Sequence, residues 1–272
     1  MPELQQSDLH GMLRRLHLSG MADSFAELAL KAAAVRLSHE AYLSEVVLRE
    51  CQVREQRRIA RLLRQSGLPL DKTFQTLELD RFPLLVQHQI AHLRSGAFVA
   101  DAINVVAAGK PGVGKTHVLA ALGHDLVLQG KAVLWISAAH LVQRLLAAKR
   151  DLRLPQELAR LDRYACLILD DIGYVQHDRD EMEVLFTLLA ERYERRSVAI
   201  STNLVFSEWE RIFKDPMTTL AAIDRVVHHS VILDLMAMDS YRAQHAIAST
   251  GASLPAPSLA TPSRANGKGR SS

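Results

Sequence analysis

Apolar residues recur at helical spacing through the first seventy positions of the chain. Near the start they fall at intervals of three and four, which predicts one buried helical face, at Leu9, Met12, Leu13 and Leu16. Ser19-Gly20 is expected to end this first helix, and a second, short helix follows it. A longer helix is predicted from about Ser38 to Ser66, because Gly67 supplies a stop signal there. The pattern therefore predicts a small all-helical module over residues 1–70, separate from the rest of the chain.

Short apolar runs and helical segments alternate after residue 100. The runs have the length of buried strands, and they cover residues 103–108, 132–136, 165–170, 197–202 and 230–235. The segments between them are long enough for the crossovers that join parallel strands. We therefore expect an α/β core over residues 101–248, in which a parallel sheet is flanked by helices. A connector is predicted over 71–100, extended from Thr73 to Asp80 and then helical from Leu84 to Leu93.

A glycine-rich segment follows the first predicted strand and precedes a predicted helix. Gly109-Lys-Pro-Gly-Val-Gly-Lys-Thr116 fits the pattern G-x-x-x-x-G-K-[ST], whose backbone N–H groups surround nucleoside phosphates. Lys115 is expected to reach the β- and γ-phosphates, and Thr116 to offer its hydroxyl group to Mg²⁺. A chance match in a glycine-rich turn is the alternative, and the flanking strand and helix argue against it. The expected nucleotide-binding residues of this segment are Gly109, Lys110, Pro111, Gly112, Val113, Gly114, Lys115, Thr116 and His117.

Polar side chains follow two of the other predicted strands. Asp170 is expected to hold Mg²⁺, and Asp171 to orient or deprotonate the attacking water; solvated acids at a strand end are the alternative. Asn203 follows the strand at 197–202, and the carboxyl ends of parallel strands line the ligand crevice. Asn203 is therefore a candidate for hydrogen bonding to the γ-phosphate or to the attacking water, with a turn-forming asparagine as the alternative.

Arginines at two places in the chain suit negatively charged partners. Arg225 follows Asp224 after an apolar helix, and it would either reach the γ-phosphate in a neighbouring subunit or form a surface ion pair. The sequence alone does not choose between these roles. Five arginines share one face of the long N-terminal helix, namely Arg54, Arg57, Arg58, Arg61 and Arg64. Such a face can follow a DNA phosphate backbone without reading its sequence, and a solvated face with Glu–Arg pairs is the alternative.

Composition narrows the class of protein. Of 272 residues, 48% are hydrophobic and 23% are charged, which is ordinary for a soluble globular protein. A net charge of +3 is too small to indicate nucleic-acid binding by itself. The chain has no apolar run of membrane-spanning length, its start lacks signal-peptide features, and its cysteines and histidines lack zinc-ligand spacing. We expect a cytoplasmic protein without a membrane partner, and a disordered tail at 249–272, where Ser, Pro, Ala and Gly dominate.

Several motifs occur in order along nearly the whole chain. They are Leu13–Met21, Gly112–His117, Leu169–Tyr174, Glu191–Ser197, Thr202–Trp209, Asp224–His229 and Ser240-Tyr-Arg242. In this combination the sequence closely resembles the IstB family, whose members are AAA+ helper ATPases encoded by insertion sequences. That family is similar to the DnaC helicase loaders, which share the ATPase core.

The resemblance implies an ATPase that uses ATP and Mg²⁺, forms a homo-oligomer on double-stranded DNA with ATP sites between subunits, and delivers or activates a cognate transposase. It implies that Asn203 senses the γ-phosphate, that Arg225 is a finger supplied in trans, and that Arg242 is a second sensor contacting the nucleotide. A DnaC-like helicase loader, whose helical module grips a replicative helicase, is the second hypothesis. The third is an ATP-binding scaffold with little turnover, against which the intact Lys115 and Asp170 argue.

Overall fold

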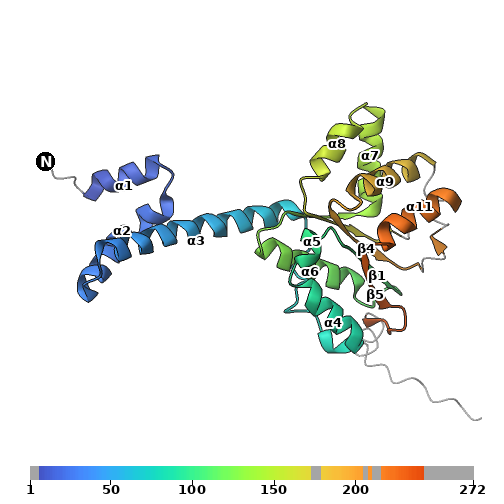
Figure 1. Ribbon diagram of the computed structural model, residues 1–272, viewed down its shortest axis with the longest axis horizontal. Coiled ribbons are helices and arrows are strands. Elements are labelled where there is room, and N and C mark those ends of the chain that lie inside the picture. The colour runs from blue at the N-terminus through green and yellow to red at the C-terminus, as the bar shows by residue number, and fades with distance from the viewer. Residues whose placement is uncertain (1–5, 173–178, 205–207, 210–215, 242–272) are drawn as a thin grey trace, which may run out of the picture.

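The computed structural model describes residues 6–172, 179–204, 208–209 and 216–241 (Figure 1). Arg242 and the tail at 249–272, both singled out from the sequence, lie outside the described residues. Within the described part, no helix is long and apolar enough to cross a membrane.

Three helices form the N-terminal part: α1 (Gln6–Arg15), α2 (Ser19–Val35) and α3 (His39–Ser66). The long helix begins and ends as predicted, because Ser38 caps its start and Gly67 takes the left-handed conformation at its end. The prediction that Ser19-Gly20 ends the first helix is wrong, since α2 begins at Ser19. The break falls at His17, whose φ of 58° lies in the left-handed region and is incompatible with a continuous α-helix.

Close packing between α2 and α3 explains why glycine stands at the start of α2. A Cβ atom on Gly20 would lie 2.9 Å from the backbone of Glu50 on α3. The buried Glu50 accepts a hydrogen bond from the N–H of Met21 at 3.1 Å and another from Arg54. Burial by itself would raise the pKa of this carboxyl, but Arg54 and the α2 N–H groups outweigh it and lower the pKa. Glu50 thus serves as the acceptor that the first turn of α2 requires.

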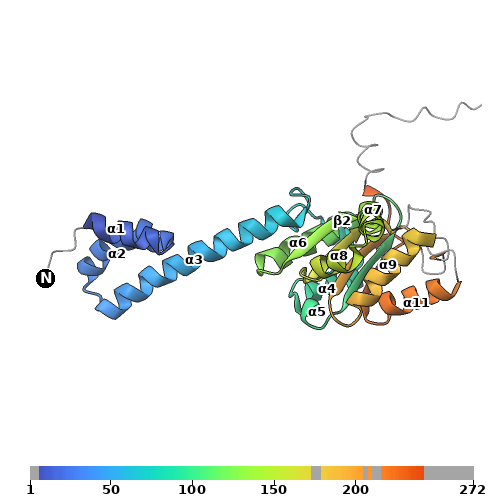
Figure 2. The same ribbon diagram turned by 90° about the horizontal axis from the view of Figure 1, so that it is seen from above.

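The helix α3 belongs to two parts of the molecule (Figures 1 and 2). Its first half packs on α2, whereas Ile59, Leu62 and Leu63 in its second half pack against the core that surrounds the sheet. Arg58 strengthens this attachment by donating to the carbonyl of Gly130 at 2.8 Å. One continuous helix therefore links the N-terminal helices to the core.

A parallel sheet of five strands forms the centre of the core, in the order β2-β3-β4-β1-β5. The strands are β1 (Asn104–Gly109), β2 (Val133–Ser137), β3 (Cys166–Asp170), β4 (Ser197–Thr202) and β5 (Ser230–Leu235). Each lies within one residue of its predicted bounds. The helices that join them are α6 (Lys115–Leu128), α7 (Ala138–Arg150), α8 (Leu154–Leu161), α9 (Arg179–Arg192) and α11 (Pro216–Val227).

Helices cover both faces of the sheet (Figure 1). Val105 and Ala107 of β1 point to one face, where α6, α4 (Leu84–Leu93) and the end of α3 lie. Val106 points to the other face, against α7, α8, α9 and α11. Because both faces are buried, the strands read as continuous apolar runs in the sequence.

The connector differs from its prediction in one respect. The stretch from Thr73 to Asp80 forms turns that lead into the short helix η1 (Leu79–Arg81), and no strand is present in it. Phe74, Leu77 and Leu79 explain the difference, because these side chains pack against the core and fold the segment onto it. The helix predicted from Leu84 to Leu93 is confirmed as α4, and the four-residue helix α5 (Ala97–Ala100) follows it.

A buried arginine joins the segment between α8 and β3 to the start of β4. Arg192, at the end of α9, is 2% exposed and donates to the carbonyl groups of Leu161, Tyr164 and Ser197 at 3.0–3.1 Å. Burial lowers the pKa of its guanidinium to about 10, so the side chain is still charged at neutral pH. Its role is structural, because it satisfies carbonyl groups that the fold removes from water.

Replacing Arg192 with leucine is expected to lower the free energy of unfolding by about 3–5 kcal/mol, because three buried carbonyl groups lose their donor. Urea denaturation measures this change. Arg195→Leu is the matched control, since the Arg195 side chain is 60% exposed and pairs with Asp162 at the surface. The control should cost at most about 1 kcal/mol. Equal losses in the two variants would contradict the structural role of Arg192.

Candidate nucleotide-binding site

The predicted phosphate loop connects β1 directly to α6. Gly112 and Gly114 have φ values of 83° and 107°, which only glycine adopts readily. Lys115 is buried, and its Nζ donates to the carbonyl groups of Gly109 at 2.7 Å and Lys110 at 2.9 Å. The ammonium group therefore lies across the loop, where phosphate oxygens would replace these carbonyl partners.

The start of α6 is ready to bind an anion. Gly114 occupies the N-cap position, and no side chain caps the first N–H groups of this helix. Such uncapped N–H groups, together with the helix dipole, attract phosphate. Nucleotide binding by the individual residues from Gly109 to His117 stays a prediction.

Two residues predicted to hold Mg²⁺ come together at the carboxyl edge of the sheet. Asp170, at the end of β3, accepts a hydrogen bond from the Thr116 hydroxyl at 3.1 Å through its Oδ1. The same oxygen accepts a second bond from Ser201 on β4 at 2.6 Å. A hydroxyl group beside a carboxylate, next to the phosphate loop, suits an oxygen-ligated Mg²⁺ ion.

Ser201 is the residue of this cluster that was not predicted from the sequence. Its hydroxyl oxygen accepts the backbone N–H of Asp171 at 2.8 Å while its proton goes to Asp170. Ser201 therefore holds the backbone in place between Asp170 and Asp171. Alternate residues of a strand point to the same face, so the sequence places Ser201 on the same face as Asn203. The sequence could therefore have indicated a role for Ser201.

Asp171 lies beside Asp170 in an unusual backbone conformation. Its φ is 67°, in the left-handed region, and its side chain is half-buried. Burial raises the pKa of this carboxyl, the charge of Asp170 raises it further, and Lys115 opposes both effects. A carboxylate with a raised pKa is a better proton acceptor than an ordinary aspartate.

Asn203 follows β4 at the same edge. Its Oδ1 atom is buried, and no hydrogen-bond partner for it lies among the described residues. A buried polar atom without a partner is costly, and functional sites are one place where it is kept for a ligand. The asparagine amide therefore offers an acceptor to a polar group that enters the site.

A cavity of about 330 Å³ opens next to the phosphate loop, within the size range of small-molecule sites. Three segments line it: the loop itself, the connector from Lys72 to Phe82, and Met238 and Tyr241 after β5. The connector was predicted only as a link between domains. Its apolar residues alone did not indicate that it would form one wall of a ligand site.

Hydrogen bonds hold these cavity walls to the phosphate loop. On the connector side, His117 Nε2 lies 3.1 Å from both the Thr76 hydroxyl and the Thr73 carbonyl. After β5, the backbone N–H of Tyr241 donates to the Gly112 carbonyl at 3.0 Å. The Tyr241 hydroxyl reaches Glu78 at 3.3 Å and so closes one side of the cavity.

Comparison with known proteins identifies the family of this chain. Residues 11–249 match the family described as IstB-like ATP binding protein. The chain belongs to the IstB-like family. It is 38% identical over 245 residues to a protein of Sinorhizobium fredii named as an insertion sequence ATP-binding protein, which covers 90% of this chain and 82% of that one. It is 34% identical over 235 residues to the ATP-binding protein named for insertion sequence IS21 of Pseudomonas aeruginosa, covering 86% and 88%.

Solved structures share the fold of this IstB-like chain. DnaA from Aquifex aeolicus, bound to AMPPCP, superposes with a TM-score of 0.53 at 15% identity, covering 70% of this chain and 58% of that chain. DnaI superposes with a TM-score of 0.52 at 17% identity, covering 62% and 94%. At these identities the likeness shows the fold alone, which is a five-stranded parallel sheet flanked by helices. The IstB-like chain is thus an ATP-binding protein of this fold class.

Arg225 of the IstB-like chain lies away from the phosphate loop. Its backbone carbonyl accepts a bond from Asn104 at 3.3 Å, and Asn104 begins β1, about 17 Å from the loop by strand geometry. Its guanidinium donates to the carbonyl of Ala221 at 3.1 Å and lies 4.7 Å from the centre of the Phe186 ring. These contacts are within the subunit, and the role of Arg225 in trans stays a prediction.

The five arginines on α3 fall into two groups. Arg54 donates to Glu50 at 2.7 Å and Arg57 to the Ser19 hydroxyl at 2.5 Å, and Arg58 reaches the core as described above. Arg61 and Arg64 are exposed, and within the described part of the chain no hydrogen bond or ion pair holds them. DNA contact stays a prediction for the whole set, and only these two are available without breaking internal contacts.

Proposed function

We propose that this IstB-like protein is an ATP-dependent DNA-binding helper that assembles on duplex DNA and delivers or activates a transposase at its target. The observation that carries the proposal is the joined cluster of Thr116, Asp170, Ser201 and Asp171 beside a phosphate loop. This cluster has the groups that ATP hydrolysis requires, rather than those of nucleotide storage alone. Membership of a family of insertion-sequence proteins supports the biological setting.

ATP and Mg²⁺ fit the residues that are present. Thr116 and Asp170 would hold Mg²⁺, because their oxygen atoms already lie 3.1 Å apart next to the loop. When bound, Mg²⁺ supplies positive charge that neutralises the phosphate oxygens during transfer. Lys115 would exchange its carbonyl partners on the loop for phosphate oxygens.

The remaining polar residues suit the handling of the attacking water. Asp171 would accept a proton from that water, and its raised pKa favours this role at neutral pH. The unpartnered oxygen of Asn203 would accept a second water proton and so orient the nucleophile. Ser201 would hold the two acids in register through its bonds to both of them.

Assembly would complete the site. Among the described residues, the Arg225 guanidinium contacts Ala221 and Phe186 of its own subunit and lies far from its own phosphate loop. A neighbouring subunit would therefore receive its charge. Arginines supplied in this way stabilise the charge of the transition state in related nucleotide hydrolases. ATP would then favour the assembled form by its higher affinity for that form.

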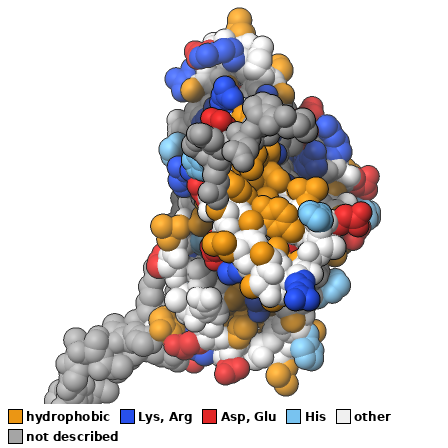
Figure 3. All heavy atoms as spheres, turned by 90° about the vertical axis from the view of Figure 1, so that its left-hand side faces the viewer, with side chains coloured by type: hydrophobic (Ala, Val, Ile, Leu, Met, Phe, Trp, Pro, Cys, Tyr) orange, Lys and Arg blue, Asp and Glu red, His pale blue; other side chains and the backbone are white. Residues whose placement is uncertain are grey.

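The N-terminal helices carry an apolar surface that suits contact with another protein chain. Figure 3 looks at this end of the molecule and shows hydrophobic side chains gathered on it. The exposed ones on α2 and α3 include Leu30, Val35, Leu43, Val47 and Leu48. Apolar patches of this kind are typical of protein–protein interfaces. The proposal requires two kinds of protein partner: further copies of this chain, and a transposase.

Reversing the charge of Arg61 and Arg64 together is expected to weaken duplex binding and to lower the salt-dependence slope by about 2, since each lost phosphate contact removes about 0.9. Fluorescence anisotropy over a salt series measures both effects. Charge reversal of Arg15, at the end of α1, together with Arg36, at the end of α2, is the charge-matched control, because both side chains are exposed. An unchanged slope in the Arg61 and Arg64 variant would exclude phosphate contact by these two residues.

Sizing of the purified protein on duplex DNA tests the proposed function as a whole. We expect a large nucleoprotein complex with ATP and a smaller species with ADP or without nucleotide. Lys115→Ala is the control, because it removes the ammonium group from the loop and should stay small in all three conditions. If the wild-type protein kept one size regardless of ATP and DNA, the proposal would be wrong.

Partner capture separates the proposed helper from the second hypothesis. With ATP and duplex DNA present, the cognate transposase should be retained by the immobilised protein. Retention of a replicative helicase in its place would favour a helicase loader. Phosphate release that DNA does not stimulate, and that Lys115→Ala does not reduce, would favour a scaffold.

A further inference from the structure

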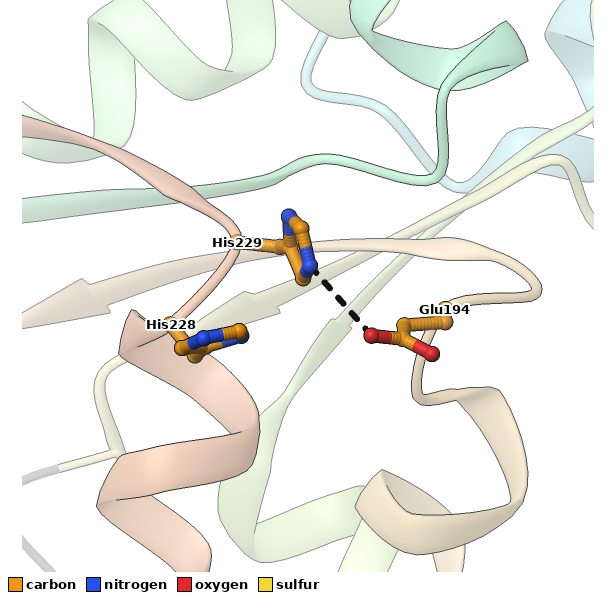
Figure 4. Close-up of side chains that lie close together, drawn as sticks. All are labelled: Glu194, His228 and His229. Atoms are coloured by element: carbon orange, nitrogen blue, oxygen red, sulfur yellow. Dashed lines mark ion pairs between the residues drawn. The ribbon is translucent and has the colours of Figure 1, made fainter.

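Two histidines and a glutamate meet at the edge of the sheet opposite the nucleotide site (Figure 4). Glu194 lies in the turn between α9 and β4, and His228 and His229 join α11 to β5. The backbone carbonyl of His229 accepts the N–H of Asn104 at 2.7 Å, which fixes the histidine pair at the start of β1. Segments from two crossovers thus bring the three side chains together, although their spacing in the sequence gives no metal motif.

The distances within this group fit a single metal ion. One ligand atom from each residue lies within 4.8 Å of the others. Glu194 Oε1 and His229 Nε2 are 3.3 Å apart, which equals the separation of about 3.3 Å between two ligands of one tetrahedral zinc ion. The remaining distances, of at most 4.8 Å, would close by rotation of these exposed side chains.

The chemistry of the group also selects a class of ion. Two imidazoles and one carboxylate form a known three-ligand set for Zn²⁺, with water in the fourth position. Mg²⁺ and Ca²⁺ prefer oxygen ligands and gain little from imidazole. The exposure of all three residues leaves room for the water ligand and gives an ion direct access from solvent.

Neighbouring groups support such a site. Tyr193 Oη lies 3.3 Å from His228 Nδ1, which leaves Nε2 of that ring for the ion. Outer partners of this kind orient metal-binding histidines. Glu194 itself has a φ of 56°, a conformation unusual for a residue with a side chain. The nearby cations Arg195 and Arg196 pair with Asp162, which reduces their repulsion of an ion.

We propose that Glu194, His228 and His229 bind a divalent transition-metal ion of the Zn²⁺ class, separately from the Mg²⁺ of the nucleotide site. The ion would tie the end of α9 to the end of α11. Arg225 lies in the last turn of α11, just before His228, and its guanidinium contacts Phe186 on α9. The bound ion therefore fixes the two helices between which Arg225 is held. This inference does not depend on the proposed function.

Calorimetric titration of the untagged, full-length, metal-free protein with Zn²⁺ tests the proposal. One equivalent is expected to bind, with equal affinity in the presence of millimolar Mg²⁺. The double variant His228→Ala/His229→Ala and the single variant Glu194→Gln should each lose at least about 10-fold in affinity. The matched control, His140→Ala/Glu191→Gln, removes another exposed histidine and an exposed acid and should bind like the wild type.

A variant can lose stability for reasons other than metal binding. Thermal unfolding with and without Zn²⁺ separates the two effects, because it measures the change in Tm that the metal causes in each variant. Zn²⁺ should raise the Tm of the wild type and of the control, because a ligand that binds only the folded state stabilises it. The double variant should show no such rise, whatever its Tm without metal. Tyr193→Phe should weaken binding by about 10-fold through loss of the outer partner. Wild-type Zn²⁺ affinity and stoichiometry in the double variant would overturn the proposal.

Discussion

Arg225→Ala is expected to reduce ATP hydrolysis by about 10³-fold or more, because an arginine supplied in trans contributes at least that factor. ATP affinity should stay near the wild-type value, since Arg225 lies at the opposite edge of the sheet from its own phosphate loop. Phosphate release and equilibrium binding of a fluorescent ATP analogue measure the two quantities. Arg195→Ala is a suitable control, as an exposed arginine near the same edge.

Mixing two inactive variants shows whether Arg225 acts between subunits. Arg225→Ala keeps Asp171, and Asp171→Asn keeps Arg225, so a mixed oligomer forms some complete sites at the interfaces. We expect hydrolysis to return in the mixture although each variant alone is inactive. A mixture as inactive as its components would show that Arg225 serves its own subunit or none, and full activity of Arg225→Ala would remove its role altogether.

Asp171→Asn is the second change with a large expected effect. Loss of the proton acceptor should reduce hydrolysis by about 10²–10⁴-fold while ATP binding persists. In the wild-type protein, the raised pKa of Asp171 should place the acid limb of the pH–rate profile above the range of an ordinary aspartate. Steady-state rates across pH 4 to about pH 8 measure this limb. A variant with wild-type turnover would exclude Asp171 as the proton acceptor.

Stability measurements test the environment of Asp171 independently of its chemistry. Because its pKa is higher in the folded protein than in the unfolded chain, ionisation costs stability as the pH rises from the unfolded toward the folded pKa. The full cost is present above the folded pKa. Asp171→Asn should therefore melt at the same or a higher temperature at neutral pH, and this advantage should vanish below the unfolded pKa. A lower Tm at neutral pH would contradict the burial and repulsion described for this carboxyl.

The sequence predicts the core well because its strands are buried on both faces. The run from Cys166 to Leu169 is apolar throughout and is followed directly by Asp170, so the sequence alone indicates both the strand and the edge at which it ends. The phosphate loop is equally clear in the sequence. Gly114 allows a positive φ, and Lys115 supplies positive charge for phosphate, at the fixed spacing of the motif. Thr116 and Asp170 then meet because parallel strands end at the same edge.

Other features depend on contacts between distant segments and leave little trace in the sequence. Arg192 looks like one arginine in a charged motif, yet it donates to three carbonyl groups of the α8–β3 segment and the start of β4. The connector lines the cavity because His117 holds Thr76, a contact across 41 residues. The start of α2 was misplaced because Ser19-Gly20 has the composition of a helix stop. Glu50 on α3 supplies the acceptor that lets a helix begin there.

The unbroken length of α3 has a mechanical consequence. Its 28 residues contain neither glycine nor proline, so no hinge interrupts a rod of about 42 Å. The rod is anchored in the core by Ile59 and Leu62, and at Gly67 it runs into the connector that lines the cavity. A tilt of about 5° at the anchored end would swing the far tip by about 4 Å. A small tilt where α3 meets the core would therefore be multiplied, over the length of the rod, into a larger displacement of the N-terminal helices.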